Sequence, residues 1–434
     1  MQTGISTTTN KSKHKLAEFI CLSLTCLFIG LSTGISGTGM IGSLIIFSSI
    51  AFILAGLLKK RETSLVIILA IALISRVALA VANSFIFSLP DTNADAIVFE
   101  SLGWDIANAW NYGTIPPETP GAYLYSKFIG VVYFITGRSP FIIQYFNVFF
   151  GFITVYFVYK LIIELGGSKR SANIGAFIAA VFPTLNLYSA VTLRENVITM
   201  MSLISVYFFI KWLNTGLISR IILAVLFLGG AASVHGAVII VGGIYLLFYC
   251  FYKPKEKQWR LINKQALIAI GITAVVFVFF RARLLNKLPS DITLVFSPDY
   301  LTSRLVPLAV GRTAYLVGYN PSSLIDIIIH TPVRILHFIL TPFPWMISSL
   351  SDIIGAVDAI MYGILGLFTV KAVKKSEGYN RILIIALLGI ILLEVFSFAW
   401  GTSNYGTAIR HRQKFVCLLI AAGAIGMCGY EKKS

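Results

Sequence analysis

One stretch of the chain carries carboxylates on an expected helix, Asp95–Trp110. At about 100° per residue, the side chains of Asp95 and Glu100 point roughly 140° apart around that helix. Both are candidate catalytic carboxylates, but they cannot face one site. Asp95 opens the helix close to the expected membrane surface and is therefore the preferred general base. Asp is also favoured as the N-terminal cap of a helix, so a structural role for Asp95 stays open.

Two further stretches combine arginine with other polar side chains. Arg194 and Glu195 stand next to each other at the outer end of an expected helix. Between the last two expected helices come Arg410, His411 and Arg412. A guanidinium forms two parallel hydrogen bonds with phosphate oxygens, so the three arginines are expected to bind a phosphate. Glu195 would hold Arg194 in place and His411 would join the phosphate site; an interfacial ion pair or anchor is the alternative reading.

A fourth stretch contains His330, Arg334 and His337 at helical intervals, which places them on one face of a helix. Arg334 and His337 are candidates for substrate binding. Arg304 and Arg312 of the same outer loop, with Arg334, are the alternative phosphate ligands if Arg194, Arg410 and Arg412 do not bind the phosphate. Zinc is a weak alternative, because two histidines without a nearby acidic ligand are more often structural. The stretch runs into Thr341–Trp345, where two prolines two residues apart predict a kinked entry into the membrane.

The composition identifies the elements that must position these residues. Of 434 residues, 57% are apolar and 12% are charged, about half the charged share usual in a soluble domain. A soluble, disordered or disulfide-rich secreted protein is thereby excluded. The formal charge of +17 is explained by basic cytoplasmic loops, so no nucleic acid partner is expected. The five cysteines have no metal-type spacing and are interpreted as small apolar residues.

The apolar runs predict an all-α, polytopic membrane protein with about twelve spanning helices, each needing roughly 20 residues. Helices on the outer face are also expected, because the apolar stretch Tyr123–Thr136 lies on the outer surface or re-enters the membrane. The expected spans are Leu16–Leu31, Gly39–Leu58, Ser64–Leu89, Phe141–Leu165, Ser171–Ala190, Asn196–Leu213, Ile218–Val234, Ala237–Tyr252, Gln265–Phe280, Ile353–Val373, Ile382–Trp400 and Phe415–Tyr430.

The basic loops predict the orientation. With residues 1–15 and 431–434 as cytoplasmic tails, every strongly basic short loop falls inside, as the positive-inside rule requires. The large loops 90–140 and 281–352 then lie outside. Lys dominates the inner side and Arg the outer side. Because topology needs only positive charge, the outer arginines suggest an anionic ligand there; salt bridges with the outer carboxylates are the alternative.

Several loose motifs occur in a characteristic order, and the order is the stronger signal. They are Asp95-Ala-Ile-Val-Phe99, Pro120-Gly-Ala-Tyr-Leu-Tyr125, Phe134-Ile-Thr-Gly-Arg-Ser-Pro140, Phe182-Pro183, Leu193-Arg194-Glu195, Pro342-Phe-Pro-Trp345 and Gly406-Thr-Ala-Ile-Arg410-His-Arg412. This series resembles polytopic glycosyltransferases of the GT-C superfamily, including aminoarabinose transferases and protein O-mannosyltransferase-like families. The resemblance covers roughly residues 64–430 and leaves 16–63 as an extra N-terminal helical hairpin.

The resemblance implies a transferase that uses a polyprenyl-phosphate-linked sugar. Carried over to this sequence, the acidic residue of the first loop is Asp95, as general base. We expect a multi-pass protein of the bacterial inner membrane whose site faces the periplasm. Its donor would be a sugar on undecaprenyl phosphate, and its acceptor a glycan or lipid-linked hydroxyl such as that of O-antigen. No cofactor is certain; some relatives use a divalent metal, but Asp95 alone offers few oxygen ligands.

Three other functions stay open. A polymerase or ligase of O-antigen or another polysaccharide would transfer a whole glycan from a lipid pyrophosphate, and His330, Arg334 and His337 would then matter more than Asp95. A transporter of lipid-linked sugars is disfavoured, because the sequence shows no repeated halves and few charges at mid-membrane depth. A non-catalytic membrane scaffold is the last alternative.

Overall fold

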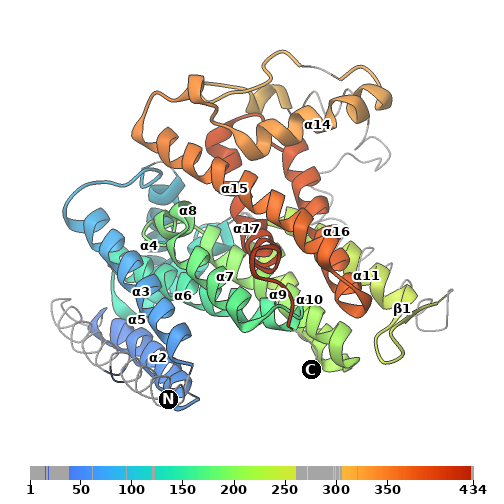
Figure 1. The fold of residues 1–434 in the computed structure, drawn as a ribbon. Coiled ribbons are helices and arrows are strands. Elements are labelled where there is room, and N and C mark those ends of the chain that lie inside the picture. Colours follow the sequence, from blue (N-terminus) through green and yellow to red (C-terminus); the bar gives the residue numbers. More distant parts are fainter. Residues whose placement is uncertain are drawn as a thin grey trace. The chain divides into compact units, whose positions relative to one another are not determined.

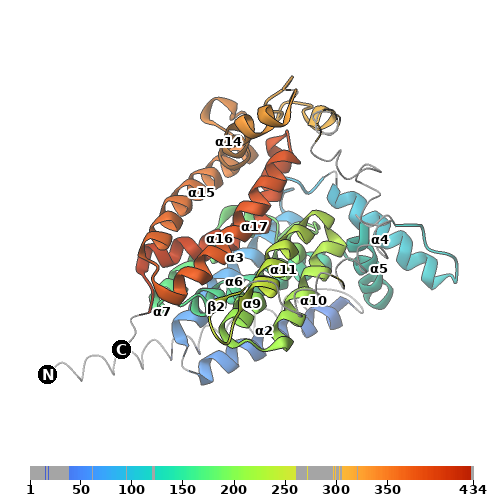
Figure 2. The ribbon, with the colours of Figure 1, turned by 90° about the vertical axis from the view of Figure 1, so that its right-hand side faces the viewer.

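The computed structural model describes residues 39–60, 62–93, 95–119, 123–260, 305–319 and 321–431, with a few isolated positions besides. These residues are mostly helical, and they cluster into two compact units that helices α6, α7 and α9 connect. Unit 1 comprises residues 1–159 and 172–200, and unit 2 comprises residues 160–171 and 201–434. The ribbon is shown in Figure 1, and in Figure 2 after a quarter turn.

Unit 1 contains the helices from the first described one to the start of α9. They are α2 (Gly39–Lys59), α3 (Thr63–Phe85), α4 (Asp95–Asn111), α5 (Leu124–Thr136), most of α6 (Pro140–Glu164), most of α7 (Lys169–Val181), α8 (Pro183–Leu187) and the first turns of α9 (Glu195–Thr215). Helices α4 and α5 pack against each other as a hairpin. Both correspond closely to the two helices expected in the first outer loop.

Unit 2 contains the remaining helices. They are α10 (Ile218–Val234), η2 (Gly236–Ile240), α11 (Val241–Phe251), η4 (Val306–Leu308), α14 (Leu324–Leu340), η5 (Pro344–Met346), α15 (Leu350–Lys375), α16 (Gly378–Trp400) and α17 (Tyr405–Cys428). A short antiparallel ladder, β1 (Tyr252–Lys253) with β2 (Gln258–Trp259), follows α11. Helix α14 packs against α15, α16 and α17, at one end of these three helices in both views (Figures 1 and 2).

Within the described ranges, five helices are long and apolar enough to cross a membrane. They are α3, α6, α9, α15 and α16. This confirms a helical membrane protein, whereas the expected total of about twelve spans stays a prediction. Two of the expected spans, Leu16–Leu31 and Gln265–Phe280, lie outside the described residues.

Two expected boundaries were wrong. The run Ser171–Ala190 is not one helix, because α7 ends at Val181 and α8 begins at Pro183. Proline has no amide hydrogen to donate and its ring clashes with the preceding turn, so the helix breaks there. Helix α17 begins at Tyr405, ten residues before the expected span. The stretch from Arg410 to Arg412 therefore belongs to a helix rather than to a loop.

The break between α7 and α8 explains the intramembrane Arg76 of α3. Its guanidinium is fully buried and donates hydrogen bonds of 3.0 Å to the carbonyl of Ala180 and 3.1 Å to that of Ala179. These carbonyls end α7, where the helix itself supplies no donor. Gly151 of α6 makes room, since a Cβ there would lie 2.7 Å from Arg76 Nε. Arg76 thus donates to buried backbone acceptors at the end of α7, where the Asn186 amide also donates to the carbonyl of Ala180.

Candidate functional site

The loop that leads into α4 is fastened to the segment after α8. The Asn83 side chain donates a 3.1 Å hydrogen bond to the carbonyl of Ala190 and accepts one of 2.7 Å from the Thr92 hydroxyl. The Tyr188 hydroxyl donates a 2.8 Å hydrogen bond to a carboxylate oxygen of Asp91. Two chain segments that are about a hundred residues apart in the sequence therefore meet at the start of α4.

The first turn of α4 brings two predicted site residues near each other. Asp95 is its first residue and is exposed to solvent, whereas Phe99, one turn later, is buried. The guanidinium carbon of Arg194 lies 5.4 Å from the centre of the Phe99 ring. Residues four positions apart share a helix face, so Arg194 lies beside the turn that Asp95 opens. The next residue, Glu195, begins α9 and is only 3% exposed.

The segment that carries Arg194 is held by Asn147 of α6. The Asn147 amide donates hydrogen bonds of 2.6 Å to the carbonyl of Val191 and 3.0 Å to that of Leu193. Its side-chain oxygen accepts a 3.1 Å hydrogen bond from the Tyr125 hydroxyl, and its own carbonyl accepts one of 3.0 Å from the Asn196 amide. Satisfied buried polar networks of this kind rigidify a core and fix the position of the segments they join.

Glu100 faces a different set of partners from those around Asp95, as its helical spacing predicted. It is buried, and its two carboxylate oxygens accept hydrogen bonds of 2.9 and 2.8 Å from Nε and Nη2 of Arg138. The Tyr133 hydroxyl donates a further 2.9 Å bond to the same carboxylate. The hydrogen bond with Glu100 raises the pKa of Arg138, and burial raises the pKa of Tyr133. This bidentate ion pair ties α4 to α5 and to the entry of α6.

Arg334, in unit 2, is buried on α14 and joins that helix to the last turn of α16 and the segment after it. It donates hydrogen bonds to the carbonyls of Ala399 (3.2 Å) and Thr402 (2.9 Å) and to the Ser403 hydroxyl (3.1 Å). Its guanidinium carbon lies 4.7 Å from the centre of the Trp400 ring. Burial lowers the pKa of Arg334. The three oxygen atoms that accept these hydrogen bonds are the polar partners of the buried guanidinium.

The two histidines of α14 flank Arg334 on the same helix face, which confirms the expected spacing. The His330 ring lies 2.7 Å from a carboxylate oxygen of Asp326 and packs against Tyr319. The His337 ring packs against Tyr315 and Phe343. Among the residues that the structure describes, no three His, Cys, Asp or Glu side chains are grouped as a metal ion would require. The described side chains thus do not fit a divalent metal site.

Arg412 is fully buried on α17 and reaches the end of α14. Its Nε donates a 2.5 Å hydrogen bond to the carbonyl of Phe338, and its Nη2 donates one of 2.5 Å to the carbonyl of Thr341. These carbonyls belong to the last turn and C-cap of α14, where acceptors need outside donors. Arg410, two residues earlier, is partly exposed. These contacts explain the burial of Arg412, and phosphate binding by Arg410 and Arg412 stays a prediction.

His411 lies in a mainly aromatic surrounding within unit 2. Its Nδ1 is 3.1 Å from the Thr402 hydroxyl, and its ring centre is 5.0 Å from that of Phe398 and 5.4 Å from that of His235. Thr402 also accepts a hydrogen bond from Arg334 through its carbonyl. Thr402, in the loop between α16 and α17, therefore contacts both His411 and Arg334.

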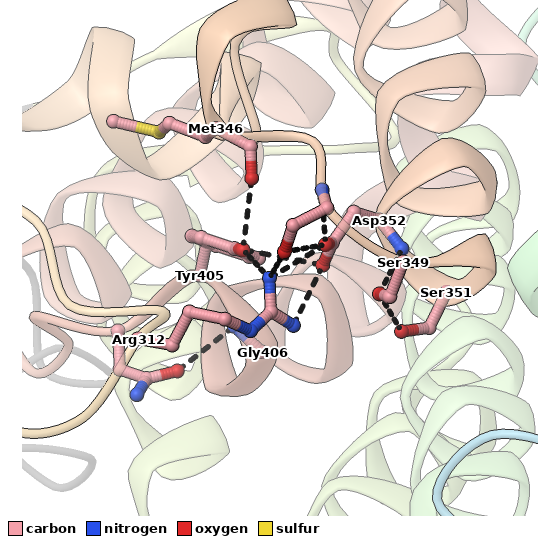
Figure 3. A network of polar contacts seen from close by, with 9 residues as sticks. Arg312, Met346, Ser349, Ser351, Asp352, Tyr405 and Gly406 are labelled. Atoms are coloured by element: carbon pink, nitrogen blue, oxygen red, sulfur yellow. Dashed lines mark hydrogen bonds and ion pairs between the residues drawn. The ribbon is translucent and has the colours of Figure 1, made fainter.

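Sequence reasoning missed a polar network around Asp352, at the start of α15 (Figure 3). Arg312 Nη1 lies 2.6 Å from one Asp352 carboxylate oxygen and 2.9 Å from the Tyr405 hydroxyl oxygen. Asp352 also accepts a 3.0 Å hydrogen bond from the Ser348 amide. The bond with Asp352 raises the pKa of Arg312. The serine three residues before Asp352, a capping pattern, is the signal that could have located this helix start.

The network has two consequences for the sequence-based expectations. Arg312, named there as an alternative phosphate ligand, forms an ion pair with a carboxylate. Arg304, named with it, lies outside the described residues. The network fastens the segment before α14 to the first turns of α15 and α17.

The fold and these sites describe a helical membrane protein with buried arginines near its helix ends. Residues 121–286 match the family model described as dolichyl-phosphate-mannose-protein mannosyltransferase. This match confirms the resemblance to GT-C superfamily glycosyltransferases. No curated protein matches the chain in a direct comparison.

A solved structure is also similar to this chain. The crystal structure of the Archaeoglobus fulgidus oligosaccharyltransferase in the apo form has a TM-score of 0.45 and 13% sequence identity to it. The similarity covers 84% of this chain and 50% of the archaeal chain. This chain therefore spans about half the length of that relative.

Proposed function

We propose that the protein transfers a sugar from a polyprenyl-phosphate donor to a glycan or lipid-linked hydroxyl on the periplasmic side of a bacterial inner membrane. The observation that carries the proposal is the first turn of α4. There the guanidinium carbon of Arg194 lies 5.4 Å from the centre of the Phe99 ring, and the exposed Asp95 stands one turn before Phe99 on the same helix. A base and a phosphate-binding cation are the two groups that such a transfer needs.

The proposed reaction is a single displacement with inversion at the anomeric carbon. Asp95 accepts the proton of the acceptor hydroxyl while that oxygen bonds to the anomeric carbon. The bond between that carbon and the phosphate oxygen breaks, and the polyprenyl phosphate leaves with the electron pair. Arg194 stabilises the negative charge that develops on this phosphate. From the sequence, Arg410 and Arg412 are further candidates for contact with the lipid phosphate.

The surroundings support these roles. The loop before α4 is fixed by Asn83 and Tyr188, and the segment of Arg194 is fixed by Asn147. A catalytic group must be held within a fraction of an ångström of its working position, which rigid neighbours achieve. The Glu100 carboxylate is buried and accepts hydrogen bonds from Arg138 and Tyr133, whereas Asp95 is exposed to solvent. We therefore assign the proton transfer to Asp95 and a positioning role to Glu100.

The test is the substitution Asp95→Asn in the full chain, reconstituted in lipid vesicles with a polyprenyl-phosphate-linked sugar and a lipid-linked glycan extract. Asn keeps the shape of the side chain and removes its basicity. We expect transfer to fall by about 10²–10⁴-fold, the usual contribution of general-base catalysis. Asp105→Asn is the matched control, because Asp105 is exposed on the same helix and has no assigned role. Near-normal transfer by correctly folded Asp95→Asn would refute the assignment.

Arg194→Lys tests the phosphate contact separately. Lysine keeps the charge but loses the paired hydrogen bonds of the guanidinium, so we expect a loss of about tenfold to a hundredfold. Undecaprenyl phosphate alone should inhibit the wild type more strongly than the variant. Equal inhibition of both would place the phosphate site elsewhere.

A polysaccharide polymerase or ligase is the second candidate. The observation that favours it is that His411 and the buried Arg334 share Thr402 as a partner in unit 2, while His337 lies on the same face of α14 as Arg334. Such an enzyme would use a glycan on a lipid pyrophosphate. Activity with a pyrophosphate-linked oligosaccharide, and none with a monophosphate-linked sugar, would favour this function.

A further inference from the structure

A cavity opens at the end of α4 that is distant from Asp95. It lies in unit 1 and has a volume of about 610 Å³, within the range of roughly 300–1,000 Å³ that is typical of small-molecule sites. Ile106 and Trp110 line it from α4 and Lys127 from α5, and the loop between these helices adds residues 116–119. None of these residues takes part in the proton transfer or phosphate binding proposed above.

The wall of this cavity is formed by an unusually close pair of helices. A Cβ added at Gly103 would lie 2.4 Å from Ile129 Cγ2, and one added at Gly130 would lie 2.7 Å from Ile106 Cγ2. On each helix, therefore, a glycine packs directly against an isoleucine of the other helix. Since such contacts leave no room for adjustment, the part of the lining that α4 and α5 contribute is in place before any ligand binds.

The lining offers one aromatic face and a few polar groups. Trp110 is 36% exposed, and Phe134 packs edge-on against it with ring centres 5.9 Å apart. Glu118 and Lys127 are exposed at the cavity and carry opposite charges. The Thr119 hydroxyl oxygen is buried and has no hydrogen-bond partner among the described residues. A ligand in the cavity can therefore pack on the Trp110 ring and form hydrogen bonds with the Thr119 hydroxyl, the Glu118 carboxylate as acceptor and the Lys127 ammonium as donor.

This combination selects the class of ligand. Because Glu118 and Lys127 carry opposite charges, the lining has no net charge that would favour an anion such as a lipid phosphate or a cation. A purely apolar ligand would leave the Thr119 hydroxyl buried without a hydrogen bond, which costs free energy. A neutral ligand rich in hydroxyls satisfies all three groups, and the apolar C–H face of a sugar ring packs on the indole of Trp110.

The position of the cavity along α4 adds a length requirement. Trp110 lies fifteen positions after Asp95, which corresponds to about 22 Å at 1.5 Å per residue. We propose that the cavity is an acceptor subsite that binds a sugar unit of an extended, neutral oligosaccharide, several units away from the hydroxyl that reacts. This inference rests on the proposed function in one respect, because it treats the bound sugar unit as part of the acceptor. Binding energy from such a remote unit would position the reacting end.

The test is direct binding, which needs no donor and no turnover. The full chain in nanodiscs is titrated with neutral oligosaccharides of two to six sugar units, and binding is followed by saturation-transfer NMR. We expect Trp110→Ala to weaken binding by about tenfold, Trp110→Phe to weaken it less, and Glu118→Gln to weaken it severalfold. Tyr112→Ala is the matched control, because Tyr112 is an exposed aromatic residue just beyond the cavity.

The outcomes separate this proposal from the proposed function. Asp95→Asn should bind the oligosaccharides as the wild type does, whether or not it transfers sugar. Equal binding by the wild type and Trp110→Ala would overturn the subsite. The absence of oligosaccharide binding, together with binding of a proline-rich peptide that Trp110→Ala abolishes, would also overturn it and assign the cavity to a polypeptide. Longer oligosaccharides that bind no better than disaccharides would overturn the extended-acceptor requirement.

Discussion

Replacing Glu100 by Gln tests whether this carboxylate positions α4 or takes part in the chemistry. In the structure Glu100 forms two hydrogen bonds of 2.8 and 2.9 Å with Arg138. Hydrogen bonds to charged groups contribute roughly 1.5–3 kcal/mol when buried. The Arg138 side chain is 44% exposed, so solvent screening reduces this value, and we expect Glu100→Gln to lower the free energy of unfolding by about 1–2 kcal/mol.

A double-mutant cycle identifies the source of that loss. The free energy of unfolding is measured by SDS titration of the protein in mixed micelles, for Glu100→Gln, Arg138→Gln and the double variant. If the ion pair is the source, the double variant should be little less stable than either single one, with a coupling of about 1 kcal/mol. Additive losses would refute the pairing.

Transfer activity completes the test of Glu100. A positioning role predicts that Glu100→Gln and Arg138→Gln lose activity to a similar and modest extent, within about tenfold. A catalytic role predicts a loss of about 10²–10⁴-fold for Glu100→Gln and a much smaller one for Arg138→Gln. The second pattern would refute our reasoning and return Glu100 to the catalytic residues.

Two further predictions concern the framework of each unit. Gly151→Ala places a Cβ 2.5 Å from the Ser189 hydroxyl oxygen, so we expect SDS titration to show a free energy of unfolding lower by about 1–3 kcal/mol. The control is Gly229→Ala, whose Cβ meets nothing within 4 Å and which should not lower the stability. Equal effects of the two substitutions would refute the steric argument. Asp352→Asn removes the ion pair with Arg312, so limited proteolysis should cut the segment 305–319 faster than in the wild type; unchanged cleavage would show that other contacts hold this segment.

The amino-acid sequence by itself determined the class of protein and most helices that the structure describes. Apolar runs of sufficient length predict helices because a membrane-spanning backbone must satisfy its own hydrogen bonds. The predicted run Ile218–Val234 coincides with α10, and the predicted helix from Asp95 ends within one residue of α4. Helical spacing also separated Asp95 from Glu100 and placed His330 and His337 on one face, because that geometry depends only on the rise and rotation per residue.

The tertiary structure alone decided which partners these side chains have. Arg76 binds carbonyls more than a hundred residues away, and Arg334 binds carbonyls and a hydroxyl at the end of α16 and just after it. Nothing in the local sequence specifies such partners, since they are set by how whole helices pack. The same reason explains why the sequence did not indicate the contacts of Arg412 with the end of α14. Local periodicity reports a residue's own helix, whereas its partners depend on segments that only the folded chain brings together.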